Sequence, residues 1–426
     1  MESFIKKTFK KRIFFENLSL LLISVIPLAI ILGPAISLAN ILIINILLIF
    51  YIFNFNRFDW INTKTFKFLI VLYLYLIVSN FFSIEPLLST SRNFGFIRFI
   101  FLFIFINYFF SQNYKTDKIL KFYLIIMSVV ILDVIFESIV GKNILGYEGN
   151  YGNRIVSFFK DEPIIGSFLN AFFLMLIGYL HLNYKSFSNL KKLLTVLFSL
   201  LFFFSIVLTG ERSNTIKAFL GFIIFYILND NYSIKKKIIF FSFLFLSISY
   251  IFLSSDFLKK RYGQQMFTQF FAKEEFKVFY DRTLYIQHYY SGFRVFVNNP
   301  ILGVGNKNYR IETCNRLNKS PTEKKKYLCS THPHQVYLEL LSEHGIVGAI
   351  ILLSILFYLM FRILNIILRS KNYLQLGCFI YLVLVFIPLL PGGSFFSDFN
   401  ATLFWLNFSF LYATNKKTNI FTNNNN

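Results

Sequence analysis

The sequence predicts an all-α fold, a polytopic membrane protein of about 12 transmembrane helices with one large periplasmic loop that contains interfacial helices. Composition supports this fold class, since 56% of the 426 residues are hydrophobic and 15% are charged. Soluble globular domains carry about 25% charged residues. The arrangement of the apolar residues also supports it, because they come in blocks of roughly 16 to 22 residues, the length that crosses a bilayer as a helix.

The apolar blocks follow one another along the whole chain. We expect spans near residues 18–33, 36–55, 66–84, 92–110, 119–140, 164–182, 190–208, 213–228, 236–253, 346–368, 373–390 and 397–415. The segment KKTFKKR could open a signal peptide, but the first apolar stretch continues almost directly into a second, which favours an uncleaved first span. The expected parts are the membrane helices of 1–253, a loop at 254–345, the membrane helices of 346–415 and a cytoplasmic tail at 416–426.

The net charge of +22 could indicate a nucleic-acid partner. Much of it, however, lies in short segments between apolar blocks, such as RFDWINTKTFK and NDNYSIKKK, whereas SIEPLLSTS and PGGSFFSD carry no Lys or Arg. Because Lys and Arg accumulate on the cytoplasmic side of membrane proteins, both chain ends are expected there, with Gly141–Pro163 and Ser254 to about Gly345 outside. The charge is then explained by topology, and membrane lipids rather than nucleic acid are the expected contact.

The second outer segment contains a further helix and a pair of cysteines. The stretch FKVFYDRTLYIQHYYSGFRVFVNN has apolar residues at helical spacing and predicts a helix lying on the membrane interface. Cys314 and Cys329 belong to the same loop, and Cys378 belongs to a span. In an oxidising compartment Cys314 and Cys329 could form a disulfide, and the alternative is two free thiols.

The stretch THPHQVYLELLSEHGIVG, Thr331 to Gly348, places three of the five histidines at the start of an apolar helix. His334 would lie at the outer membrane face, where an imidazole can act as a base near neutral pH, and His332 is the competing candidate. The alternative is a histidine in a surface loop. Gly345 and Gly348 would let two backbones approach closely. A metal site at HPH is not expected, because no ligand spacing typical of zinc is present.

The segment TGERSN, residues 209–214, predicts a tight outer turn that places Glu211 and Arg212 next to hydrocarbon. The guanidinium of Arg212 has a planar fork of donors suited to phosphate oxygens. The alternatives are an arginine that extends to lipid headgroups and an ion pair with Glu211. Arg282 and Arg294 on the interfacial helix are either phosphate ligands or lipid contacts, and NPILGVG after them predicts a turn whose glycines expose backbone N–H groups.

Other charged residues fall inside the expected spans. Arg98 and Lys217 do so, and Asp133 and Glu137 lie one helical turn apart near an outer end. Charges at such depth are either functional or structurally paired. Nucleotide-binding loops, an Asp-x-Asp motif and a dinucleotide fingerprint are absent from the sequence, so no cofactor is expected.

Together these segments resemble the superfamily of O-antigen ligases and O-antigen polymerases. Its ligases carry a signature of His, then Asn, Ser or Gln, nine residues, Gly, two residues and Gly, which His334, Gln335, Gly345 and Gly348 fit. The hPllGvG turn of the family is similar to NPILGVG, with Asn299 in place of the usual His. An arginine upstream of that turn matches Arg282, and an arginine in an outer turn between spans matches Arg212.

The resemblance implies transfer of a glycan at the periplasmic face of the bacterial inner membrane, in lipopolysaccharide or surface polysaccharide biosynthesis. The donor would be a glycan on undecaprenyl pyrophosphate and the acceptor a sugar hydroxyl. Arginines would hold the pyrophosphate, and His334 would be the base. Because the donor is already activated, the resemblance implies neither ATP nor a metal.

The acceptor separates the two activities within the superfamily. A ligase transfers to lipid A core, whereas a polymerase transfers to another lipid-linked repeat unit, and the signature favours the ligase. A membrane transporter is a minor alternative. It would predict broken helices and buried charges at the middle of the membrane, whereas the polar clusters here lie at the outer ends of the spans.

Overall fold

The computed structural model describes residues 2–55, 58–112, 116–149, 154–160, 162–265, 283–314 and 327–422. In these ranges the regular secondary structure is helical and no strand is present, which confirms the all-α prediction for them. The helices are α1 (Glu2–Ser24), α2 (Ile26–Leu32), α3 (Pro34–Phe55), α4 (Lys64–Ser79), α5 (Pro86–Gly95), α6 (Ile97–Ser111), α7 (Thr116–Val140), α8 (Ile165–Leu182), α9 (Asn189–Leu208), α10 (Arg212–Leu228), α11 (Ile234–Ser254), α12 (Asp256–Leu258), α15 (Leu284–Asn298), α16 (Tyr309–Cys314), α18 (Val336–Phe361), α19 (Leu364–Ser370), α20 (Tyr373–Val385) and α21 (Asp398–Ala413).

Seven helical segments in the described part of the chain are long and apolar enough to cross a membrane. They are Pro34–Asn54, Lys64–Phe82, Pro86–Ser111, Thr116–Val140, Ile165–Leu182, Asn189–Leu208 and Val336–Ser370. An eighth span is added if Ile13–Ser24 and Ile26–Leu32, which meet at a bend of 50°, count as one. These segments confirm a polytopic membrane protein. Helices α10, α11, α20 and α21 occupy the other expected positions without meeting the same criterion, so a total of about 12 spans stays a prediction.

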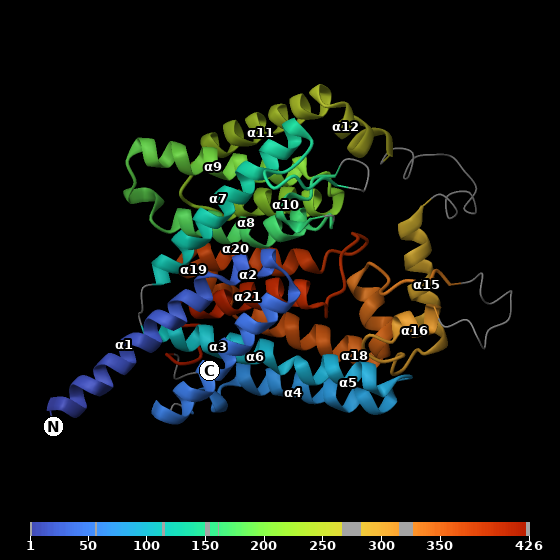
Figure 1. The fold of residues 1–426 in the computed structure, drawn as a ribbon. Coiled ribbons are helices and arrows are strands. Elements are labelled where there is room, and N and C mark those ends of the chain that lie inside the picture. The colour runs from blue at the N-terminus through green and yellow to red at the C-terminus, as the bar shows by residue number, and fades with distance from the viewer. Residues whose placement is uncertain are drawn as a thin grey trace.

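Helices α20 and α21 form the centre of the bundle. Figure 1 shows them between α8 on one side and α6 and α18 on the other. Two glycines allow α8 and α20 to pack closely, because a Cβ at Gly178 would collide with the backbone of Tyr373, and a Cβ at Gly377 with that of Leu174. This tight pair fixes the position of the loop that follows α20, which borders the site described below.

Helix α15 lies across the end of the bundle that is remote from the start of α1, and it packs against α18 (Figure 1). It is the described part of the helix expected over the stretch FKVFYDRTLYIQHYYSGFRVFVNN, and its contact with a membrane interface stays a prediction. The short helix α16 ends at Cys314, which forms a disulfide with Cys329. Of the two alternatives for these cysteines, the disulfide is therefore confirmed.

The charged residues of α6 and α7 have structural partners. One carboxylate oxygen of Glu137 accepts a hydrogen bond from the backbone N–H of Val156 at 3.0 Å, and the other accepts one from Ser157 at 2.6 Å. Asp133 accepts from the backbone N–H of Ile144 at 2.9 Å and from the hydroxyl of Ser157. The two carboxylates thus hold the segment after α7 in place. In α6, Arg98 forms an ion pair with Asp398 at the start of α21.

Candidate functional site

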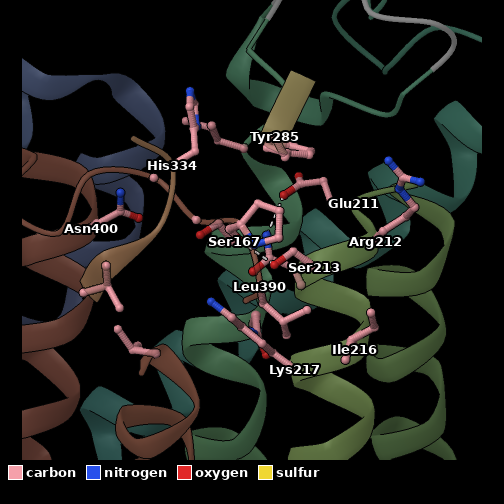
Figure 2. Close-up of a pocket in the computed structure, with 18 of the residues that line it drawn as sticks. Ser167, Glu211, Arg212, Ser213, Ile216, Lys217, Tyr285, His334, Leu390 and Asn400 are labelled. Carbon is pink, nitrogen blue, oxygen red and sulfur yellow. Dashed lines mark hydrogen bonds between the residues drawn. The ribbon is translucent and has the colours of Figure 1, made fainter. Parts of the chain in front are cut away.

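A cavity of about 600 Å³ opens among α8, α10, α15 and the loop between α20 and α21 (Figure 2). It brings together residues that are far apart in the sequence. The polar and aromatic side chains that line it include Arg154, Ser167, Asn170, Glu211, Arg212, Ser213, Asn214, Lys217, Arg261, Tyr285, Tyr289, His332, His334 and Asn400. Four of the residues predicted for the site are in this set: Glu211, Arg212, His332 and His334.

Three arginines lie close together at one side of the cavity. Arg212 begins α10, Arg154 comes from the segment after α7, and Arg261 belongs to a π-helix, η5 (Lys259–Gln264). The guanidinium of Arg261 donates a hydrogen bond to the carbonyl of Gly210 at 3.0 Å, next to the turn that carries Arg212. Burial, and then the positive charges of Arg154 and Arg212, lower the pKa of Arg261 to about 10. Such a cluster is a site for an anion.

Glu211 holds the turn beside these arginines in place. One of its carboxylate oxygens accepts a hydrogen bond from the backbone N–H of Gly166 at 2.6 Å, at the N-terminus of α8. The other accepts from the amide of Asn214 at 2.7 Å. A carboxylate is favourable at a helix N-terminus, but burial outweighs these bonds and raises the pKa of Glu211 to about 7. The role of Glu211 is therefore to join the TGERSN turn to α8.

The predicted base, His334, lies at the opposite side of the cavity in a group of three imidazoles. Its ring centre is 4.1 Å from that of His332 and 4.4 Å from that of His288 on α15. The carbonyl of His334, a residue with φ of 56°, accepts a hydrogen bond from the N–H of Gly392 at 2.8 Å. Burial first, and then His332, lower the pKa of His334 to about 4, so the ring is neutral at pH 7 and can accept a proton.

The remaining signature residues shape the helix behind His334. Gln335 caps α18, because its side-chain oxygen accepts a hydrogen bond from the N–H of Leu338 at 2.8 Å. Gly345 interrupts α18 with φ of 63°, and a Cβ there would collide with the backbone of Ile301. A Cβ at Gly348 would collide with the hydroxyl of Tyr75. The close backbone approach expected of this motif is thus present at Gly345.

The NPILGVG turn was expected to expose glycine N–H groups, and this expectation is wrong. The N–H of Gly303 donates to the carbonyl of Asn299 at 3.1 Å, and the N–H of Gly305 donates to that of Glu343 at 2.8 Å. The break of α18 at Gly345 leaves helix carbonyls without their usual partners, and the turn satisfies them. The two glycine N–H groups are thus used within the protein, and a Cβ at Gly303 would collide with the backbone of Glu343.

The other predicted arginines have different outcomes. Arg294 of α15 places its guanidinium 4.4 Å from the ring centre of Tyr290 and is not among the residues that line the cavity. Arg282 lies outside the described residues. Arg154, Arg261 and His288 were not among the predicted site residues. Arg154 and Arg261 belong to no motif, and His288 is an unmarked position of the expected interfacial helix, so only their proximity to Arg212 and His334 in the fold reveals them.

The cavity is strongly biased towards positive charge. Among the described residues that line it, Arg154, Arg212, Lys217 and Arg261 are basic, and Glu211 carries the only carboxyl group. In the same part of the chain, no group of three or more His, Cys, Asp or Glu side chains is arranged to hold a metal ion. A cavity of this kind suits an anionic ligand that carries several charges.

The comparisons with known proteins agree with this geometry. The family model described as O-antigen ligase matches residues 197–353, a range that contains the TGERSN turn, α15, His332 and His334. No curated protein matches the chain. The match to the family model confirms the resemblance predicted from the motifs. Residues 197–353 are therefore similar to the O-antigen ligase family, whose members are membrane enzymes that act as ligases or polymerases.

Proposed function

We propose that this protein transfers a glycan from undecaprenyl pyrophosphate to a sugar hydroxyl at the periplasmic face of the bacterial inner membrane. The observation that carries the proposal is the cavity that a cluster of three arginines and His334 line together. A pyrophosphate diester carries negative charge that guanidinium groups bind well. A hydroxyl nucleophile needs a base, and His334 is neutral at pH 7.

The proposed reaction is a displacement at the anomeric carbon of the donor sugar. The bond between this carbon and the phosphate oxygen breaks, a bond to the acceptor oxygen forms, and the acceptor proton passes to a ring nitrogen of His334. The leaving lipid pyrophosphate gains one negative charge, which Arg154, Arg212 and Arg261 stabilise. Because these three arginines can stabilise the negative charge of the leaving pyrophosphate, we propose that the transfer needs no metal. A pyrophosphate contact by Arg282 stays a prediction.

The outer face is supported by the disulfide between Cys314 and Cys329, since such bonds form in oxidising compartments. It is also supported by the basic segments, which the expected topology places on the opposite side of the membrane from the cavity. As acceptor we propose lipid A core, because His334, Gln335, Gly345 and Gly348 fit the ligase signature. Another lipid-linked repeat unit, the acceptor of a polymerase, is the alternative.

The test is glycan transfer by the purified full-length protein. A glycan on undecaprenyl pyrophosphate is offered with lipid A core in one reaction and without it in another, and the products are identified by mass. We expect a glycosylated core in the first reaction. Products with several repeat units on one lipid would identify a polymerase, and the absence of transfer in both reactions would contradict the proposed function. Profiles of lipopolysaccharide and undecaprenyl-linked glycans in a deletion strain provide the cellular control.

A further inference from the structure

Lys217 is a cation of the cavity that stands apart from the arginine cluster. It lies on α10, five residues after Arg212. Five residues correspond to a rotation of about 140° round the helix axis, so the two side chains leave α10 in different directions. Figure 2 shows the amine of Lys217 pointing towards the side of the cavity where Asn400 and His334 lie, whereas Arg212 extends to the other side.

The described part of the chain supplies no carboxylate partner for Lys217. None of the ion pairs found there includes it. Glu211 has the only carboxyl group among the described residues that line the cavity, and its two oxygens bind Gly166 and Asn214. An ammonium group at the end of a membrane helix is costly when it has no counter-ion, most of all once a bound substrate displaces water from the cavity.

The loop between α20 and α21 connects Lys217 with the predicted base. The hydroxyl of Ser213, one turn before Lys217 on α10, donates a hydrogen bond to the carbonyl of Pro391. The N–H of the next residue, Gly392, donates to the carbonyl of His334 at 2.8 Å. A Cβ placed on Gly392 would lie 3.9 Å from the Nζ of Lys217. Lys217 and His334 therefore border the same short segment.

We propose that Lys217 is a second anion-binding position, which contacts a phosphate or carboxylate oxygen of the bound substrate on the His334 side of the cavity. This inference rests on the proposed function, and it adds a residue and a charge requirement to it. The anion has two possible sources. One is the sugar-proximal phosphate of the donor, whose charge increases as the sugar leaves. The other is an acidic group of the acceptor next to the attacking hydroxyl.

The experiment compares three variants of the full-length protein. Lys217→Met removes the charge and keeps the length of the side chain, and Lys217→Arg keeps the charge. Lys191→Met, at an exposed lysine of α9, is the matched control. Since Lys217 has no carboxylate partner among the described residues, Lys217→Met leaves no opposite charge unpaired, and equal thermal unfolding of the variants is checked first. Each variant is then measured for binding and for transfer.

In the donor arm, the probes are undecaprenyl pyrophosphate and uncharged undecaprenol. Lys217→Met is expected to weaken binding of the pyrophosphate about tenfold or more without affecting undecaprenol, because a charge-assisted hydrogen bond is lost. In the acceptor arm, lipid A core is used with its phosphates and after their removal. A rise in KM only for the phosphorylated core would identify the acceptor as the source. In either arm, Lys217→Arg should restore most of the loss.

If Lys217→Met behaves as Lys191→Met in both arms, the proposal is overturned. This outcome differs from failure of the proposed function. If the wild-type protein transfers no glycan but still needs Lys217 to bind undecaprenyl pyrophosphate, the proposed function fails and the anion contact stands. If wild-type and Lys217→Met proteins transfer equally well with equal KM values, only the role of Lys217 is lost.

Discussion

Two groups of charged residues lie at ends of the apolar helices α7 and α10, and they differ in what surrounds them. At the end of α7, Asp133 and Glu137 accept hydrogen bonds from three backbone N–H groups and one hydroxyl of the following segment. Around the start of α10, the described residues that line the cavity include four basic side chains and one carboxyl group. The first group is satisfied by the protein itself. The second has an excess of charge that a bound anion would neutralise.

This comparison separates charges that serve the structure from charges that indicate a binding site. In the sequence both groups are equally good candidates for functional residues, since charged side chains near hydrocarbon are energetically costly. In the structure the carboxylates of α7 accept hydrogen bonds from the segment that follows this helix. The cations around α10 instead line a cavity of about 600 Å³. We therefore expect changes in the cavity to affect catalysis and changes at α7 to affect stability.

The largest effect is expected at His334. Replacing it with alanine removes the proposed base, and loss of a general base typically costs about a hundredfold to ten-thousandfold in rate. His334→Ala should therefore nearly abolish transfer while expression and pyrophosphate binding remain. His332→Ala is the matched control, and its loss should be smaller. The measurement is initial rate with purified protein, and wild-type turnover by His334→Ala would remove the assignment.

A smaller loss is expected at Arg212. Arg212→Lys keeps the charge and loses the planar fork, so kcat/KM should fall about tenfold or more. Arg294→Lys should have a weaker effect, because Arg294 stacks on Tyr290 and is not among the residues that line the cavity. Rates at several donor concentrations separate the two variants. Equal losses in both would mean that Arg294 binds the donor as the sequence alone suggested.

At α7 the effect should be on stability. Asp133→Asn keeps the size of the side chain but weakens its bonds to Ile144 and Ser157, and loss of a hydrogen bond to a charged group costs about 1.5 to 3 kcal/mol. The thermal unfolding midpoint in detergent should fall. Transfer per folded molecule should stay near that of the wild type. A stable Asp133→Asn protein with impaired transfer would contradict the division between the two groups of charges.

The smallest change is expected when the pH is lowered from 7 to 5. Burial holds the pKa of His334 near 4, below the usual value, so the neutral form is present above this value and is lost as the pH falls through it. The pH profile of kcat/KM reports such groups of the free enzyme and should therefore fall only near pH 4. The pKa of Glu211 is about 7, and a Glu211→Gln profile shows whether any step near pH 7 belongs to this residue. A fall centred near pH 6.5 in both profiles would mean that the base titrates as an exposed histidine.

Much of the site was predictable from short motifs. The TGERSN turn and the stretch from His334 to Gly348 identified Arg212, His334 and the glycine at the break of α18, because turns, caps and helix breaks depend on residues close in sequence. Helix class and membrane character followed from the length and hydrophobicity of the apolar blocks. These features depend on residues that are close together in the chain, so they can be predicted from the sequence.

Which residues lie together in the cavity depends on the tertiary fold. Arg154, Arg261 and His288 join the site from the segment after α7, from η5 and from α15, and no periodicity or spacing links these segments. The tertiary fold also decided that the NPILGVG amides bind α18 and that Asp133 and Glu137 hold a loop. The helices and the chemical groups they carry can be read from the sequence alone. Their assembly around one cavity depends on long-range packing, such as the glycine contact between α8 and α20, which only the folded chain contains.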